Sequence, residues 1–212
     1  MVYILDIEYK IDKIKIFKRL HIEENTETYK NADSYFIELY NIVRKNMKIT
    51  ALYTIVDSFN LEYKELDRFE KYVLCFISAK DDLSNISNNM MSSGEYLKGY
   101  LINEMATDVI FNVSNKMNSI IREQTKKLGC ELSKRFAPGD DGLQLKHQKT
   151  ILEYLKKEVD IDASLSEEYM IIPGISLLYL YGLDKCTLNH SLSSDKCVSC
   201  SNLNCEYREQ KS

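Results

Sequence analysis

Apolar residues recur at every fourth position over one long stretch of the chain. The row begins with Leu97, Leu101 and Met105 and keeps this spacing as far as Ile121. One face of an α-helix repeats at nearly this interval, so the pattern predicts a long amphipathic helix over residues 94–128. A stripe of this kind packs on a core, and we do not interpret it as a cofactor site.

Other segments give shorter helical signals. Asp12 suits the N-cap of a short helix in the residues that follow it. Residues 26–47 and residues 145–158 carry apolar side chains at helical spacing, and each segment is predicted to be a helix. Residues 81–91 are rich in Asn and Ser, which indicates a loop or a weak helix.

Strand signals alternate with these helices. Residues 5–9 alternate apolar and polar side chains, as a half-buried strand does. Residues 50–59 are rich in β-branched and aromatic residues, and residues 72–77 form a continuous apolar run that fits a buried central strand. Two further strands are predicted at residues 169–172 and 177–183.

The order of these elements favours the α+β class, because helices and strands are mixed without a regular βαβ repeat. We expect a single domain with an antiparallel sheet and long amphipathic helices over residues 1–183. From residue 184 the apolar content falls, and residues 184–212 are predicted to form a cysteine-rich tail.

Composition narrows the class of protein only slightly. The 212 residues are 44% hydrophobic and 28% charged, which is ordinary for a globular protein. The net charge of −4 gives no reason to expect a nucleic-acid partner. No apolar run approaches the roughly 18 residues of a membrane helix, and the first residues lack the features of a signal peptide. We therefore expect a cytoplasmic protein without a membrane partner.

The only two prolines of the chain, Pro138 and Pro173, are each followed directly by glycine. Proline fixes φ and the following glycine permits a positive φ, so each pair predicts a sharp turn. Just before the second pair lie Glu167 and Glu168. They could form a pair of catalytic acids, but adjacent residues on a strand point to opposite faces, so we assign them no role in proton transfer.

The residues around both turns resemble a known family, the activation (or reactivation) domain of vitamin B12-dependent methionine synthase in its small standalone form. Arg135-Phe136-Ala137-Pro138-Gly139 matches the family's Arg-x-x-Pro-Gly-Tyr up to the last position. Residues 165–176, Leu-Ser-Glu-Glu-Tyr-Met-Ile-Ile-Pro-Gly-Ile-Ser, are similar to its Leu-Thr-Glu-Ser-(aromatic)-x-Met-x-Pro-x-x-Ser. Between them, residues 145–149 resemble the Leu-Glu-x-Gln-Lys that opens the family's helix.

The resemblance implies a function. Domains of this family bind S-adenosylmethionine and dock against the cobalamin-bearing domain. An electron from flavodoxin or a similar donor reduces the inactive cobalt, and the methyl group of S-adenosylmethionine then traps it as methylcobalamin. The chain is therefore expected to be an accessory protein for a cobalamin-dependent methionine synthase or another corrinoid protein, and not a complete enzyme. Its cobalamin would be carried by the partner.

The resemblance also assigns site residues. Arg135 is the candidate to hold the carboxylate of S-adenosylmethionine, because its planar fork of donors suits a bidentate contact. Ala137 would contribute backbone groups, and Gly139 would let the main chain approach the ligand. Asp140 stands where the family has tyrosine. A carboxylate that points into the site would repel the ligand carboxylate or pair with Arg135.

A second departure lies in the long helix, where an ungapped alignment puts Phe111 at the family's acidic position. Asp108 and Asn112 lie close to it in sequence. These departures support an alternative hypothesis, a degenerate binding or regulatory module that has lost S-adenosylmethionine.

The cysteines complete the sequence evidence. In a reducing cytosol six cysteines indicate thiols or metal ligands, and Cys75 and Cys130 are interpreted as structural. Four more follow a C-x10-C-x2-C-x4-C pattern that could hold zinc or an iron–sulfur cluster, with His190 a possible substitute for the first: Cys186, Cys197, Cys200 and Cys205. The structural alternatives are a small zinc knuckle that holds the tail in place, or reduced thiols without metal. Standalone relatives of the family end in a similar tail. Because a protein that passes an electron to cobalt can use a redox-active cluster, we favour an iron–sulfur cluster over zinc.

Overall fold

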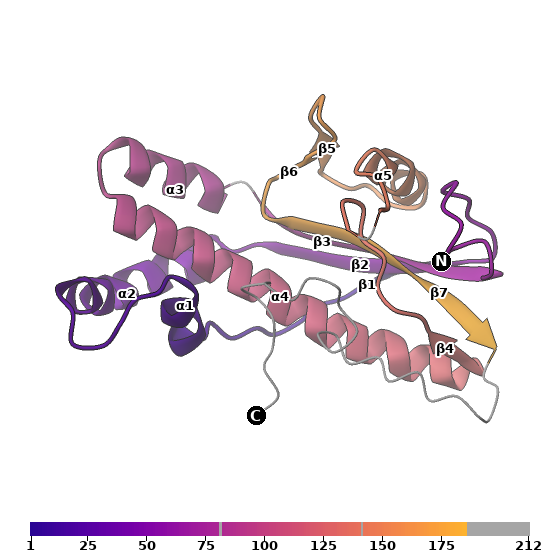
Figure 1. Cartoon of the computed structure of the whole chain (residues 1–212), viewed down its shortest axis with the longest axis horizontal. Coiled ribbons are helices and arrows are strands. Elements are labelled where there is room, and N and C mark those ends of the chain that lie inside the picture. Colours follow the sequence, from indigo (N-terminus) through magenta and orange to yellow (C-terminus); the bar gives the residue numbers. More distant parts are fainter. Residues whose placement is uncertain (81, 141, 186–212) are drawn as a thin grey trace.

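A five-stranded antiparallel sheet with helices on both faces organises the chain (Figure 1). The computed structural model describes residues 1–80, 82–140 and 142–185. The strand order is β1-β2-β3-β7-β4, and β5 and β6 form a separate two-stranded hairpin. The elements in chain order are β1 (Val2–Ile4), α1 (Lys13–Arg19), α2 (Glu27–Asn46), β2 (Ile49–Val56), β3 (Lys71–Ala79), α3 (Asp82–Ser92), α4 (Tyr96–Lys127), β4 (Cys130–Leu132), α5 (His147–Glu158), β5 (Ser164–Leu165), β6 (Ile171–Ile172) and β7 (Ser176–Lys185).

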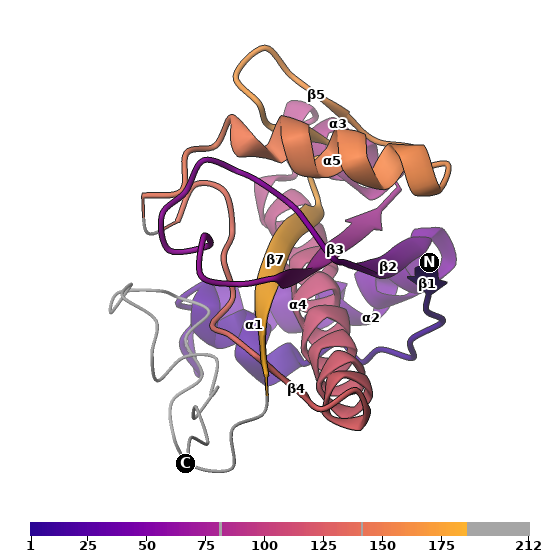
Figure 2. The same ribbon diagram turned by 90° about the vertical axis from the view of Figure 1, so that its right-hand side faces the viewer.

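The central strand β3 separates two apolar layers. Its side chains alternate between the faces of the sheet, so Cys75 packs with the core beneath α4 while Leu74 and Phe76 pack with the core beneath α5. Figure 2 shows the sheet between these two helices. The continuous apolar run of residues 72–77 is explained by this burial on both faces, and its predicted place at the centre of the sheet is confirmed.

The long helix α4 confirms the four-residue repeat. Its stripe from Leu101 to Ile121 is fully buried against the sheet. The N-cap predicted at Asp12 is confirmed, because its side chain accepts a hydrogen bond from the Lys15 N–H at 3.1 Å. At the start of α2 the Thr26 hydroxyl accepts one from the Tyr29 N–H at 3.1 Å. The predicted α+β class with an antiparallel sheet is confirmed.

Two predicted segments differ in the structure. The strand predicted at residues 5–9 is wrong: β1 is Val2–Ile4, and residues 5–12 have no regular secondary structure. The alternation is still meaningful, since Leu5, Ile7 and Tyr9 pack against the core from an extended segment. Residues 81–91, interpreted as a loop or weak helix, contain most of α3. There the Ser87 hydroxyl donates to the Gly99 carbonyl at 2.9 Å, so packing on α4 stabilises a weak helical sequence.

The strand predicted at residues 169–172 is shorter and lies elsewhere than expected. Only Ile171–Ile172 are in a strand, and they pair with Ser164–Leu165 in the hairpin and not with the main sheet. The last strand, β7, continues to Lys185, two residues past the end of the predicted domain. The division at residue 184 is otherwise still a prediction. Within the described ranges, none of the helices is both long and apolar enough to cross a bilayer.

Candidate functional site

After β4 the chain runs beside β7, which positions the Arg135 motif at the edge of the sheet. The Phe136 N–H donates to the Leu180 carbonyl at 2.9 Å, and the Leu180 N–H donates back to the Phe136 carbonyl at 2.8 Å. Phe136 is buried in the core beneath α5. Because neighbouring side chains in an extended segment point in opposite directions, Arg135 and Ala137 lie toward the face covered by α4.

The first Pro-Gly pair forms the predicted sharp turn. The Asp140 N–H donates to the Ala137 carbonyl at 2.9 Å, and Gly139 has a φ of +102°. Proline second and a positive-φ glycine third are the arrangement of a type II turn. The Gly139 N–H also donates to the Leu143 carbonyl at 2.7 Å, which ties the turn to the approach to α5.

The second Pro-Gly pair bends the chain in a different way. The peptide bond before Pro173 is cis, and Gly174 does not adopt the positive φ that its sequence permits. The Ser176 hydroxyl donates to the Pro173 carbonyl at 2.7 Å and shares a hydrogen bond with the Ser78 hydroxyl at 2.8 Å. These bonds fix the start of β7, the strand beside which the Arg135 segment lies.

Arg135 lies over a buried tyrosine of β7. Its guanidinium carbon is 5.5 Å from the centre of the Tyr179 ring, while the side chain of Arg135 is exposed. The Tyr179 hydroxyl donates to the Asn118 amide oxygen at 3.2 Å and shares a hydrogen bond with the Ser114 hydroxyl at 3.1 Å. Burial raises the pKa of Tyr179 well above its usual value, so the ring beneath Arg135 is neutral. A cation over a neutral aromatic face is favourable.

The charges around Arg135 leave room for a carboxylate. Asp140 is exposed, and no ion pair joins it to Arg135 in the described part of the chain. Among these residues the guanidinium of Arg135 has no carboxylate partner at all. The guanidinium group of Arg135 is therefore exposed to solvent on one side and packs on the Tyr179 ring on the other.

The acidic candidate in α4 is turned away from this site. Asp108 accepts hydrogen bonds from the Arg19 guanidinium at 3.0 Å and from the Asp12 N–H at 3.1 Å, so it links α4 to the start of α1. Phe111 lies three residues before Ser114 and seven before Asn118, which puts it on the face of α4 that meets Tyr179. The alignment of Phe111 with the family's acidic position stays a prediction.

Glu167 and Glu168 lie in the turn of the β5–β6 hairpin and not on a strand, which corrects the argument from opposite faces. Both are exposed. The Ser166 hydroxyl donates to the Glu168 carboxylate at 2.9 Å and accepts from the Glu168 N–H at 3.2 Å, bonds that shape the turn. The following Tyr169 has a φ of +65°.

Sequence reasoning missed two open pockets along α5, on the other side of the sheet from Arg135. One, of about 390 Å³, is lined by Lys146, His147 and Lys149 and by residues 60–62. The other, of about 420 Å³, adjoins it, and Arg135 lines neither pocket. The only sequence feature that could have indicated the first pocket is the run Lys-His-Gln-Lys at residues 146–149, three of whose residues line it.

The cysteines divide into two groups. Cys75 is fully buried, and burial raises the pKa of its thiol well above the usual value, as expected for a structural cysteine. Cys130 is partly buried in β4, and both are free thiols. The four predicted metal ligands at positions 186, 197, 200 and 205, with His190, lie outside the described residues. Inside the described ranges no group of three or more potential metal ligands is found.

Comparison with known proteins gives a structural relationship and no sequence relationship. No protein-family model matches the sequence, and no curated protein matches it. The structure is similar to the crystal structure of the MetH reactivation domain bound to AdoHcy, with a TM-score of 0.62 and 10% sequence identity over 88% of this chain and 79% of that one. At this identity the likeness concerns the fold alone. The fold of this chain is therefore similar to that of the MetH reactivation domain.

Proposed function

We propose that the chain is an accessory module that binds S-adenosylmethionine at the edge of β7 and supports the reductive methylation of a corrinoid protein. The observation that carries the proposal is the exposed guanidinium of Arg135, which is supported by Tyr179 and has no carboxylate partner among the described residues. The similar reactivation domain was crystallised with AdoHcy, the demethylated product of S-adenosylmethionine, and this supports a ligand of the same type here.

The proposed roles of the site residues are those that the family resemblance implies. Arg135 would hold the ligand carboxylate through two parallel hydrogen bonds. Ala137, which is partly buried, would contribute backbone groups to the site, as the resemblance implies. Gly139 carries no side chain at the exposed turn, where the main chain can come close to the ligand.

The chemistry itself would belong to the corrinoid, which the partner carries. S-adenosylmethionine supplies the methyl group, and an electron donor such as flavodoxin supplies the electron. The partner would be a cobalamin-dependent methionine synthase or another corrinoid protein. This chain would bind and orient the methyl donor and would not form a complete enzyme.

A second candidate function is a binding or regulatory module that has kept the fold and lost the ligand. Phe111 favours it, because an aromatic side chain occupies the face of α4 near Tyr179 where the family has an acid. Asp140 favours it too, since a carboxylate at the end of the turn lowers the affinity for a second carboxylate.

Calorimetry with S-adenosylmethionine tests the proposal. We expect binding by the full chain and its loss in Arg135→Ala. The matched control is Arg68→Ala, since Arg68 is also exposed and lies over an aromatic ring, 4.5 Å from the centre of Phe69, outside the site. No heat and no protection from unfolding would reject S-adenosylmethionine binding. If Asp140→Tyr then restores binding, the degenerate module is the better description.

We also propose that the cysteine tail binds an iron–sulfur cluster or zinc through Cys186, Cys197, Cys200 and Cys205. The support is the ligand spacing alone. Metal analysis and absorbance of anaerobically purified protein test it. Iron–sulfur absorbance bands would exclude zinc as the sole metal, and protein free of both metals would reject the proposal.

A further inference from the structure

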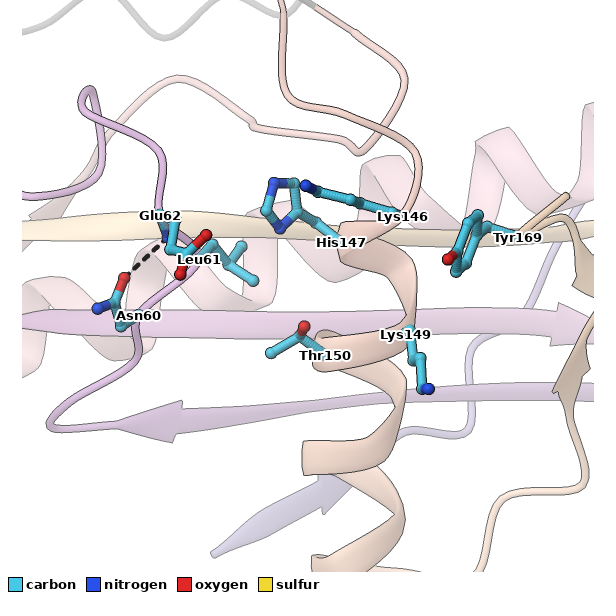
Figure 3. A pocket seen from close by; sticks show the side chains of 8 residues that line it. All are labelled: Asn60, Leu61, Glu62, Lys146, His147, Lys149, Thr150 and Tyr169. Carbon is cyan, nitrogen blue, oxygen red and sulfur yellow. Dashed lines mark hydrogen bonds between the residues drawn. The ribbon is translucent and has the colours of Figure 1, made fainter.

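The proposed function does not use the pocket of about 390 Å³ at the start of α5, although small-molecule sites have volumes in this range. Residues 60–62 form one wall of this pocket, and α5 forms the other (Figure 3). Lys149 and Tyr169 also line it, but in Figure 3 they lie on the opposite side of the start of the helix from His147. The groups that share one space are therefore those on the His147 side.

One positive and one negative side chain face this space from its two walls. Lys146 extends beside the His147 ring, and the Glu62 carboxylate lies across from them (Figure 3). Burial lowers the pKa of His147, the charge of Lys146 lowers it further, and the charge of Glu62 opposes this shift. The His147 ring is therefore uncharged at neutral pH, so the charges of Lys146 and Glu62 balance and this side of the pocket has no net charge.

The fold itself uses neither of these two charges. Lys146 and Glu62 are both exposed, and no ion pair involves either of them within the described ranges, including one between the two. The neutral His147 ring on the same side has one N–H donor and one acceptor nitrogen. A ligand that carries both charges could therefore fill the space between Lys146 and Glu62.

The backbone of its loop holds Glu62 in position. The Glu62 N–H donates to the amide oxygen of the Asn60 side chain at 2.8 Å, and Glu62 has a φ of +51°. A residue other than glycine adopts this left-handed conformation only where the surrounding structure holds it there. The preceding Leu61 is buried in the core beneath α5 and anchors the loop. The carboxylate thus extends from an anchored segment.

We propose that this side of the pocket binds a free α-amino acid as its zwitterion, with the carboxylate on Lys146 and the His147 ring N–H and the ammonium group on Glu62. A zwitterion is attracted by both walls, whereas Glu62 repels a simple anion and Lys146 repels a simple cation. Asn60 and Thr150 complete a polar lining, which favours a small polar side chain such as that of serine. Because the charges are exposed, we expect a dissociation constant of about 1 mM. The proposal does not rest on S-adenosylmethionine binding.

An NMR titration of the full chain with L-serine tests this inference, with the ring protons of His147 as the reporter. The chain has three histidines, and the signals lost in His147→Gln identify the reporter. We expect saturable shifts with L-serine and about tenfold weaker binding of N-acetyl-L-serine, which lacks the ammonium group, and of L-serinamide, which lacks the carboxylate. Lys146→Ala and Glu62→Gln should each weaken L-serine binding by about tenfold. The matched controls are Lys126→Ala and Glu167→Gln, which remove exposed charges outside this pocket.

The proposal would be overturned if L-serine gives no saturable shift up to about 50 mM, well above the expected dissociation constant. It would also be overturned if N-acetyl-L-serine binds as tightly as L-serine, or if the control variants weaken binding as much as the site variants. All four charged residues are exposed, so the variants are expected to fold, and their unfolding midpoints check this. Arg135→Ala should leave L-serine binding unchanged, and Lys146→Ala should leave S-adenosylmethionine binding unchanged. The two proposals can therefore fail independently.

Discussion

The guanidinium carbon of Arg135 lies 5.5 Å from the centre of the Tyr179 ring, and Tyr179 is in turn fixed by α4 through Ser114 and Asn118. An exposed arginine side chain ordinarily samples many rotamers, and ordering it costs entropy. An immobile aromatic surface beneath it restricts that freedom before a ligand arrives. The position of Arg135 thus depends on contacts between β7 and α4 that its own neighbours in sequence do not make.

Removing the Tyr179 hydroxyl should lower the stability of the fold while leaving the aromatic ring beneath Arg135 in place. Tyr179→Phe keeps the ring beneath Arg135 but leaves Ser114 and Asn118 without their partner, so the free energy of unfolding should fall by about 1–2 kcal/mol. Tyr181→Phe is the control, because Tyr181 is equally buried on the same strand and its hydroxyl makes no hydrogen bond to the described residues. Urea denaturation of both variants measures the difference. Equal losses would contradict a stabilising role for the hydrogen bonds of Tyr179.

The planar geometry of the Arg135 guanidinium, and not only its charge, should contribute to the affinity for S-adenosylmethionine. Arg135→Lys keeps a cation at the turn but cannot make two parallel hydrogen bonds to a carboxylate, and it loses part of the stacking on Tyr179. We expect the affinity for S-adenosylmethionine to fall by about tenfold, as measured by calorimetry. An unchanged dissociation constant would mean that the ligand carboxylate is held by another group.

The link between α1 and α4 should be a major source of stability. Arg19 bonds Asp108 and Glu104 at 3.0 Å each, and these side chains are at most 14% exposed. Asp108→Asn removes one of the two carboxylates that neutralise the buried guanidinium of Arg19. The free energy of unfolding should therefore fall by about 2 kcal/mol. Asp33→Asn breaks the exposed pair of Asp33 with Lys13 and should cost below about 1 kcal/mol. Chemical denaturation compares the two, and similar losses would refute the difference in burial as the cause.

A glycine in β7 is required by packing. A Cβ atom at Gly182 would lie 2.2 Å from the Cγ and Cδ2 atoms of the Phe69 ring. Gly182→Ala must therefore displace that ring, and we expect a loss of about 2–3 kcal/mol in the free energy of unfolding. In the double variant with Phe69→Leu the combined loss should be smaller than the sum of the two single losses. Additive losses would contradict the clash.

The long-range parts of the site could not be predicted from the sequence. The α4 stripe and the turn at Gly139 follow from local periodicity and φ preferences, and both were found. The contact of Arg135 with Tyr179 depends on the pairing of Phe136 with Leu180, which no local pattern encodes. Likewise, alternation at residues 5–9 indicates an extended chain but does not say whether a neighbouring strand pairs with it.

A buried tyrosine should make the fold sensitive to alkali. Burial raises the pKa of Tyr53 to about 12, with the negative charges of ionised Tyr3 and Cys75 adding to the effect, and its hydroxyl donates to Gln124. The unfolded chain releases this proton at a pH of about 10, so Tyr53 contributes stability that is complete below that pH and is lost as the pH rises toward 12. The free energy of unfolding should fall across this range less steeply in Tyr53→Phe than in the unmodified protein. Denaturant titrations at several pH values measure both slopes, and equal slopes would exclude Tyr53 as a source of alkaline unfolding.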